Sequence, residues 1–216
     1  MQRPDSMLSV TENQLLYKIH HPTANPENIV IEIPPGKSSI AVMFSAGVES
    51  TLVLTLIKLF SDRVRPLQVT AFTVEKSENY EYYAAKILAL NFFSAIKHVT
   101  KVQNARSDGV IREGITRILN RENVDLVFTG LNRTPDVFIG PVGPKRDSPE
   151  FIATIPKLRC PVLHLTKDYT VSALRTLNEL VGTDLYSMTH TCTESRTPCR
   201  HCWFCKERAW AESVLC

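Results

Sequence analysis

The sequence predicts an α/β fold: a Rossmann-like, doubly wound parallel sheet with helices on both faces. Short, continuous apolar runs, as expected of strands buried on both faces, alternate with segments of helical periodicity. The 216 residues suit one domain with a small appendage, and 44% hydrophobic and 22% charged residues are typical of a globular protein. The net charge of +3 is too small to indicate a nucleic-acid-binding protein by itself.

The elements are expected in the order strand, helix, strand, helix. A short β-rich run at residues 29–33 comes first and ends at two prolines. The strands expected in the main sheet are residues 40–44, 67–74, 95–101, 124–129 and 161–165. The expected helices are residues 49–60, 80–91, 108–121 and 170–181, and a long irregular loop is expected at 131–149. We therefore divide the chain into an N-terminal extension with a short strand (1–36), an α/β domain (37–186) and a C-terminal tail (187–216).

The segment after the first main strand has the composition of a phosphate-binding loop. It reads Phe44, Ser45, Ala46, Gly47, Val48, Glu49, Ser50 and Thr51. Gly47 permits a tight turn and a close approach to a ligand, and the three hydroxyls are potential donors to phosphate oxygens. The helix that follows begins with unpaired N–H groups and a positive dipole end, which favour an anion. A simpler interpretation, in which Ser45 or Ser50 only caps the helix, stays open at this point.

Four cysteines near the C-terminus form a C-x6-C-x2-C-x2-C pattern. They are Cys192, Cys199, Cys202 and Cys205. Four thiolates are the usual ligand set of a closed tetrahedral zinc site, and nearby arginines and lysines would favour the thiolate form. An iron–sulfur cluster, or two disulfides, are the alternatives.

The loop sequence resembles the PP-loop of the ATP pyrophosphatases, which read Ser-Gly-Gly-x-Asp-Ser at the end of the first strand. The match keeps Ser45, Gly47 and Ser50, whereas Ala46 and Glu49 replace glycine and aspartate. The resemblance implies that ATP and Mg²⁺ bind at residues 44–51, with the adenine near Thr73 and Val74 and a further contact at Gly130.

The pairing of this loop with a four-cysteine tail resembles the 7-cyano-7-deazaguanine synthase family. Arg208 follows the last cysteine as in that family, and residues 149–152, 165–167 and 188–192 are similar to its segments. Residues 74–78, by contrast, depart from the family pattern after the second strand. The resemblance implies Zn²⁺ at the cysteines and conversion of 7-carboxy-7-deazaguanine and ammonia to the nitrile through an adenylated intermediate.

The basic residues Lys167 and Arg133, with Lys145 and Arg146, are candidates to stabilise phosphate or an anionic substrate. We name Lys167 and Arg133 as the catalytic candidates. Two other functions stay open. One is a tRNA-thiolating or other PP-loop adenylating enzyme, and the other is a zinc-containing binding module that has lost its catalytic activity.

No apolar run reaches the roughly 18 residues needed to span a bilayer. The first residues also lack the hydrophobic centre of a signal peptide. We therefore expect a cytoplasmic protein with a small-molecule deazapurine substrate, no membrane partner and no stable nucleic-acid binding. The sequence leaves open whether the chain forms a homodimer.

Overall fold

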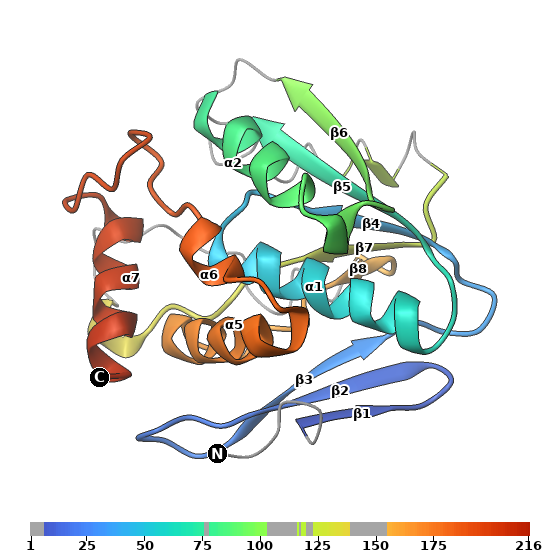
Figure 1. The fold of residues 1–216 in the computed structure, drawn as a ribbon, viewed down its shortest axis with the longest axis horizontal. Coiled ribbons are helices and arrows are strands. Elements are labelled where there is room, and N and C mark those ends of the chain that lie inside the picture. Colours follow the sequence, from blue (N-terminus) through green and yellow to red (C-terminus); the bar gives the residue numbers. More distant parts are fainter. Residues whose placement is uncertain (1–6, 76–77, 103–115, 117, 120–122, 139–154) are drawn as a thin grey trace.

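The centre of the molecule is a parallel sheet of five strands in the order β6-β5-β4-β7-β8 (Figure 1). The computed structural model describes residues 7–75, 78–102, 116, 118–119, 123–138 and 155–216. The strands are β4 (Ser39–Met43), β5 (Gln68–Glu75), β6 (Lys97–Val102), β7 (Leu126–Thr129) and β8 (Leu158–Arg159). From β4 the chain adds β5 and β6 on one side, then β7 and β8 on the other. The predicted fold class is therefore confirmed, with its topological switch point between β4 and β7.

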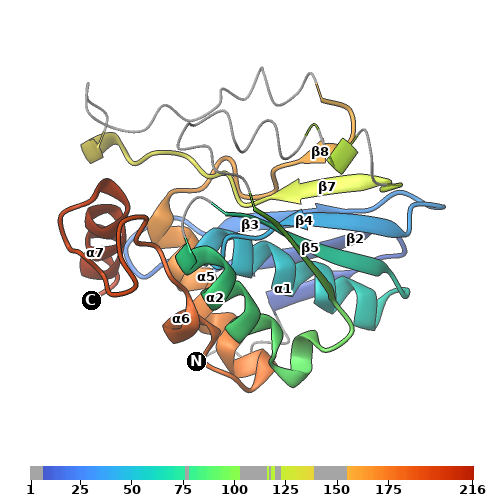
Figure 2. The same ribbon diagram turned by 90° about the horizontal axis from the view of Figure 1, so that it is seen from above.

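Three long helices, α1 (Val48–Arg63), α2 (Glu78–Leu88) and α5 (Lys167–Val181), lie on one face of this sheet (Figure 2). Helix α1 is buried along most of its length, because it lies between the sheet and α5. The opposite face packs its apolar side chains, among them Met43, Phe72 and Val127, against Ile118. The other elements that follow β4 are the short η2 (Asn91–Phe93), η3 (Asp136–Phe138) and α6 (Leu185–Met188), and the C-terminal helix α7 (Trp203–Val214).

The N-terminal residues form a second, antiparallel sheet of three strands. These strands are β1 (Leu8–Val10), β2 (Gln14–Ile19) and β3 (Glu27–Glu32), in the order β1-β2-β3. Alternate side chains of β2 (Leu15, Tyr17 and Ile19) are buried, and the Tyr17 hydroxyl donates to the Ala173 carbonyl of α5 at 3.2 Å. Only the third of these strands was expected, although the alternation along β2 was a readable signal.

The fifth main strand was predicted at residues 161–165, and that position is wrong. The strand that pairs with β7 is β8, which ends before Pro161. Proline has no N–H to give to a ladder, and the following residues turn instead, with Leu163 N donating to Cys160 O at 3.1 Å. The helix predicted at 170–181 begins earlier, at Lys167. The helix predicted at 108–121 and the loop beyond residue 138 fall mostly outside the described residues.

Across the described part of the chain, no helix combines the length and the apolar character that a membrane span requires.

Candidate functional site

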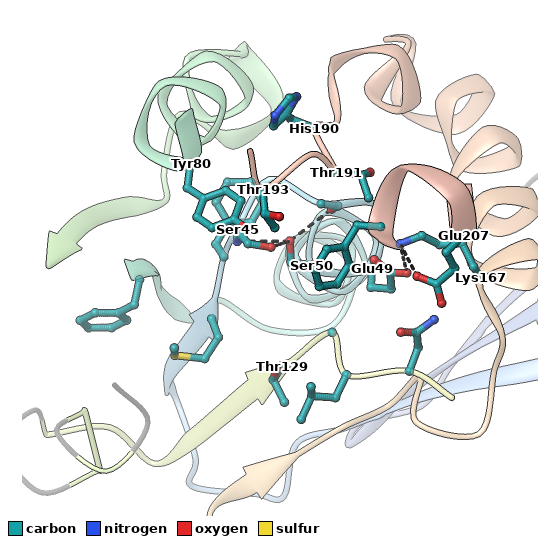
Figure 3. Close-up of a pocket in the computed structure, with 18 residues that line it drawn as sticks. Ser45, Glu49, Ser50, Tyr80, Thr129, Lys167, His190, Thr191, Thr193 and Glu207 are labelled. Carbon is teal, nitrogen blue, oxygen red and sulfur yellow. Dashed lines mark hydrogen bonds and ion pairs between the residues drawn. The ribbon is translucent and has the colours of Figure 1, made fainter. Parts of the chain in front are cut away.

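A cavity of about 220 Å³ lies at the carboxyl ends of β4, β5 and β7, next to the switch point (Figure 3). Its lining comes from the predicted phosphate loop, the strand ends, the first residue of α5 and the C-terminal tail. The lining residues are Met43, Phe44, Ser45, Gly47, Glu49, Ser50, Phe72, Tyr80, Thr129, Gly130, Leu131, Asn132, Lys167, His190, Thr191, Thr193, Phe204 and Glu207. Open parallel sheets bind ligands at this position, so the cavity is the candidate active site.

The phosphate loop presents the start of α1 to this cavity. Gly47 is the N-cap of α1 and the helix has no side-chain cap, so the first-turn N–H groups have no capping side chain. Ser50 Oγ instead donates to the Gly47 carbonyl at 3.2 Å, and Ser45 N donates to Ser50 Oγ at 3.3 Å. The interpretation in which Ser45 or Ser50 caps the helix is therefore wrong. An uncapped helix N-terminus beside two hydroxyls suits an anion.

The left-handed turn of this loop falls on Ala46 and not on Gly47. Ala46 has φ +57°, whereas Gly47 is extended with φ −73°. A side chain in this region costs roughly 1–2 kcal/mol, so neighbouring contacts must stabilise the turn. One such contact is a hydrogen bond from His190 N to the Ala46 carbonyl, at 2.9 Å. The tail is thus attached directly to the phosphate loop.

Three buried charged side chains meet on one side of the cavity. Lys167, at the start of α5, contacts the Glu49 carboxylate, and its Nζ lies 3.9 Å from Glu207 Oε2 (Figure 3). The side chains of Lys167, Glu49 and Glu207 are 4%, 11% and 0% exposed. A buried charge is stable only with a partner, so this arrangement fixes the relative positions of three segments. Sequence reasoning identified Lys167 and Glu49 but missed Glu207, because one glutamate on a helix carries no signal.

The tail forms the cavity wall beside α2. His190, Thr191 and Thr193 line this wall, and Tyr83 of α2 stacks on His190 with ring centroids 4.1 Å apart. Burial lowers the pKa of His190 from its usual value. Tyr80 also lines the cavity, and burial together with the nearby charges of Cys192 and Cys202 raises its pKa to about 12. This side of the cavity therefore offers a neutral phenol from α2, and hydroxyls and an imidazole from the tail, to a bound molecule.

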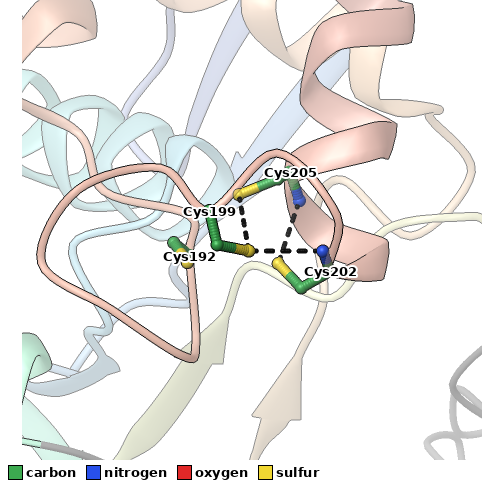
Figure 4. Close-up of side chains that lie close together, drawn as sticks. All are labelled: Cys192, Cys199, Cys202 and Cys205. Carbon is green, nitrogen blue, oxygen red and sulfur yellow. Dashed lines mark hydrogen bonds between the residues drawn. The ribbon is translucent and has the colours of Figure 1, made fainter.

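The four cysteine sulfurs lie within 4.8 Å of one another (Figure 4). Cys199 Sγ accepts from Cys202 N at 3.3 Å and Cys202 Sγ from Cys205 N at 3.4 Å, so each x2 spacing makes the same N–H···S turn. Cys199 Sγ lies 3.9 Å from Cys205 Sγ. Zn–S bonds of about 2.3 Å place tetrahedral sulfurs roughly 3.8 Å apart, so the donor set fits a single ion.

The thiols differ in their readiness to ionise. Burial disfavours the Cys192 thiolate, but hydrogen bonds from Cys199, Ser195 and Glu194 outweigh it and lower the pKa of Cys192 to about 5. Burial raises the pKa of Cys205 to about 12 and that of Cys199 above its usual value. A cation would therefore have to displace protons from Cys199 and Cys205.

Other expected residues lie away from the cavity lining. Thr51 is fully buried, and Thr73 is fully buried with its hydroxyl 2.9 Å from His98 Nε2. Arg133 is exposed, whereas its neighbour Asn132 lines the cavity. Ala46 and Val48 are also outside the lining, and the side chain of Val74 is not among the described ones. Lys145 and Arg146, and the similar segment at 149–152, lie outside the described residues.

No protein-family model matches the chain, and no curated protein matches it. Among solved structures, the U34-tRNA thiolase NcsA from Methanococcus maripaludis with its [4Fe-4S] cluster is similar, with 17% identity and a TM-score of 0.48. The match covers 82% of this chain and 64% of that one. A likeness at this level carries no conclusion about activity, which has to be argued from the site.

Proposed function

We propose that this chain is an ATP-dependent adenylating enzyme of the PP-loop type, with the phosphates of ATP on residues 44–51. The observation that supports it most is the uncapped N-terminus of α1, which opens into the cavity beside Ser45 and Ser50. These N–H groups and hydroxyls can donate hydrogen bonds to an anion. Glu49 is the one carboxylate on the loop, and it contacts Lys167. Mg²⁺ arriving with ATP would offset phosphate charge, and Lys167 would add a cation near the same oxygens.

The proposed reaction starts with attack of a substrate oxygen on the α-phosphorus of ATP. The new O–P bond forms as the bond from the α-phosphorus to the bridging oxygen breaks, and pyrophosphate leaves. The substrate oxygen then departs as AMP when a second nucleophile attacks the activated carbon. Preorganised N–H groups at the start of α1 would stabilise the charge that develops on the phosphate oxygens.

Nitrile formation is the first candidate for the full reaction. The cavity is small and lined by the four-cysteine tail, which supports a small planar substrate between that tail and ATP. An acid becomes a nitrile by losing two oxygens, so ammonia and two ATP molecules are needed, each giving AMP and pyrophosphate. In this reaction 7-carboxy-7-deazaguanine would be the acid.

tRNA thiolation is the second candidate, because the tail exposes Arg196, Arg200 and Lys206. Clustered positive side chains attract a phosphate backbone. In that reaction a base carbonyl oxygen would be adenylated and replaced by sulfur. For the cysteine site we propose zinc, since the close approach of the four sulfurs supports one ion over a cluster of several irons.

One assay tests the proposal and separates the candidates. The metal-loaded protein is incubated with ATP and either the deazaguanine acid with ammonia or unmodified tRNA with a sulfur donor. Pyrophosphate release, nitrile and thiolated base are measured, and bound zinc and iron are quantified. Ser45→Ala is expected to slow pyrophosphate release by about a hundredfold, the low end for one lost oxyanion donor. The matched Ser9→Ala, on exposed β1, should not. Absence of ATP binding to the metal-loaded protein would contradict the proposal.

A further inference from the structure

The four-cysteine site is linked to the phosphate loop at two separate points. The first is the hydrogen bond from His190 N to the Ala46 carbonyl, at 2.9 Å. The second runs from Glu207 through Lys167 to Glu49, with 3.9 Å between Glu207 Oε2 and Lys167 Nζ. Both links end on residues of the loop that line or shape the cavity.

Each link begins two residues from a cysteine ligand. His190 precedes Cys192 by two positions, and Glu207 follows Cys205 by two. Between these cysteines, residues 193–201 contain no helix or strand. Backbone structure alone therefore does little to fix the distance between Cys192 and Cys205. An ion bound by both sulfurs would fix it.

We propose that metal bound at the four cysteines sets the shape of the phosphate loop, with Glu207 as the residue that transmits this effect. Glu207 is a positioning residue: it orients Lys167, which in turn orients Glu49 at the start of α1. The inference rests on the proposed function, because the loop is taken as the ATP site.

The energetics of the buried charges favour such coupling. Glu207 is fully buried, and its carboxylate is stabilised in that position by the Lys167 ammonium. The start of α7 is fixed by Cys202, the N-cap whose sulfur accepts from Cys205 N. If the ion is lost, the four sulfurs are no longer held together, so this turn is free to shift and Glu207 moves with it. Lys167 and Glu49 then lose one of their fixed neighbours.

The second link acts on the least favourable backbone position of the loop. Ala46 has φ +57°, and His190 N donates to its carbonyl. Release of Cys192 removes one of the contacts that position His190, and this hydrogen bond is weakened. The left-handed turn at Ala46 then relaxes toward a more common conformation. Both links therefore predict a lower ATP affinity in the metal-free protein.

Coupling between two binding sites is reciprocal. If metal raises the affinity for ATP, then ATP raises the affinity for metal by the same factor. This reciprocity provides a measurement that does not depend on turnover. A merely structural role of Glu207 would lower stability without making the two affinities depend on each other.

The experiment compares the zinc-loaded full chain with Glu207→Gln and with Glu179→Gln, the same exchange at an exposed position of α5 outside the cavity lining. ATP affinity is measured by calorimetry, and zinc affinity by competition with a chelator, with and without ATP. Hydrogen exchange reports on residues 44–51. Glu207→Gln is expected to weaken ATP binding by about tenfold at equal zinc content, within the usual range of site-to-site coupling. ATP should raise zinc affinity about as much in the wild type, but not in this variant. Glu179→Gln should behave as the wild type.

Two results would overturn the inference. The first is equal ATP affinity in all three proteins together with no effect of ATP on chelator competition, which would leave the proposed function standing. If the wild type fails to bind ATP, the proposed function is wrong, and hydrogen exchange then decides the coupling. The second result that would overturn the inference is hydrogen exchange at residues 44–51 that does not change when zinc is removed. Should Glu207→Gln fail to fold, Glu207→Asp keeps the charge, and its ATP affinity should fall between those of the wild type and the metal-free protein.

Discussion

A methyl group added at Gly130 would lie 2.6 Å from the backbone nitrogen of Ser50 and 2.7 Å from the Glu49 carbonyl carbon. The end of β7 therefore packs directly against the first turn of α1, with no space for a side chain. Neither neighbour is a flexible side chain that can turn aside. Gly130 thus determines how closely the strand end approaches the helix N-terminus that we propose binds phosphate.

Gly130→Ala is expected to lower the free energy of unfolding by about 1–3 kcal/mol, the usual cost of overpacking a rigid site. ATP affinity should fall as well, because the start of α1 has to move. Urea denaturation and calorimetric ATP titration measure the two effects. Gly47→Ala is the comparison, since the nearest atom to its added methyl is Ser45 Oγ at 3.3 Å, on a side chain that can rotate. A Gly130→Ala protein as stable as the wild type would contradict this account of the packing.

Lys167→Met is expected to lower the free energy of unfolding by roughly 3–5 kcal/mol, because it leaves buried carboxylates without their ammonium partner. Adding Glu49→Gln to this variant should recover part of the loss, since the uncompensated charge is then removed. Denaturant unfolding of the single and double variants gives the coupling between the two residues.

Lys37→Met provides the control for that experiment. Lys37 pairs with Asp125 at 3.3 Å, but its side chain is 46% exposed. Its loss should therefore cost less than about 1 kcal/mol. Equal losses for Lys37→Met and Lys167→Met would show that burial of the Lys167 pair contributes nothing.

Metal binding at the four cysteines is expected to release at least about two protons per ion at pH 7, because thiols ionise when they bind metal. The pKa of Cys205 is raised to about 12 and that of Cys199 is also raised, so both are thiols before the ion binds. Cys192, with a pKa of about 5, is already a thiolate and adds little. Calorimetry in buffers of different ionisation enthalpy counts the protons. The same linkage requires metal affinity to fall as the pH falls.

Cys199→Ser separates this site from the other thiols. The chelator concentration that removes the ion should be more than about tenfold lower for this variant than for the wild type, because only three of the four sulfur ligands remain. Cys216→Ser should not, because Cys216 is exposed and lies outside the cluster. Equal retention of zinc by both variants would mean that the cluster is not the binding site.

The parts of this protein that could be predicted from its sequence are those with local patterns. The apolar runs of β4, β5 and β7, the composition of the phosphate loop and the cysteine spacing are all local. The strand predicted at 161–165 is wrong because Pro161 has no N–H for a ladder, a signal that was readable in the sequence and that outweighs the apolar run. The tail wall of the cavity, including Glu207, could not be foreseen, because folding joins it to residues more than a hundred positions away.

Folded stability is expected to fall as the pH drops below 6.5, partly through His98. Burial lowers the pKa of His98 below its usual 6.5, although the negative charge of Glu81 acts to raise it. The Nε2 atom of His98 lies 2.9 Å from the Thr73 hydroxyl. As the pH falls through 6.5, the unfolded chain takes up a proton that folded His98 still resists, so the unfolded state is favoured. Above 6.5 both states are neutral at this residue and its contribution is constant.

Denaturant unfolding between pH 5 and 8 measures this dependence, and NMR titration of the His98 ring measures its folded pKa. His98→Gln should reduce the slope below pH 6.5, while His190, whose pKa burial also lowers, supplies part of the remainder. A ring that titrates at 6.5 in the folded protein would abolish the predicted effect, and one that titrates above 6.5 would reverse its sign. The slope would then be unchanged or steeper in His98→Gln, and the loss of stability in acid would have to arise from other groups.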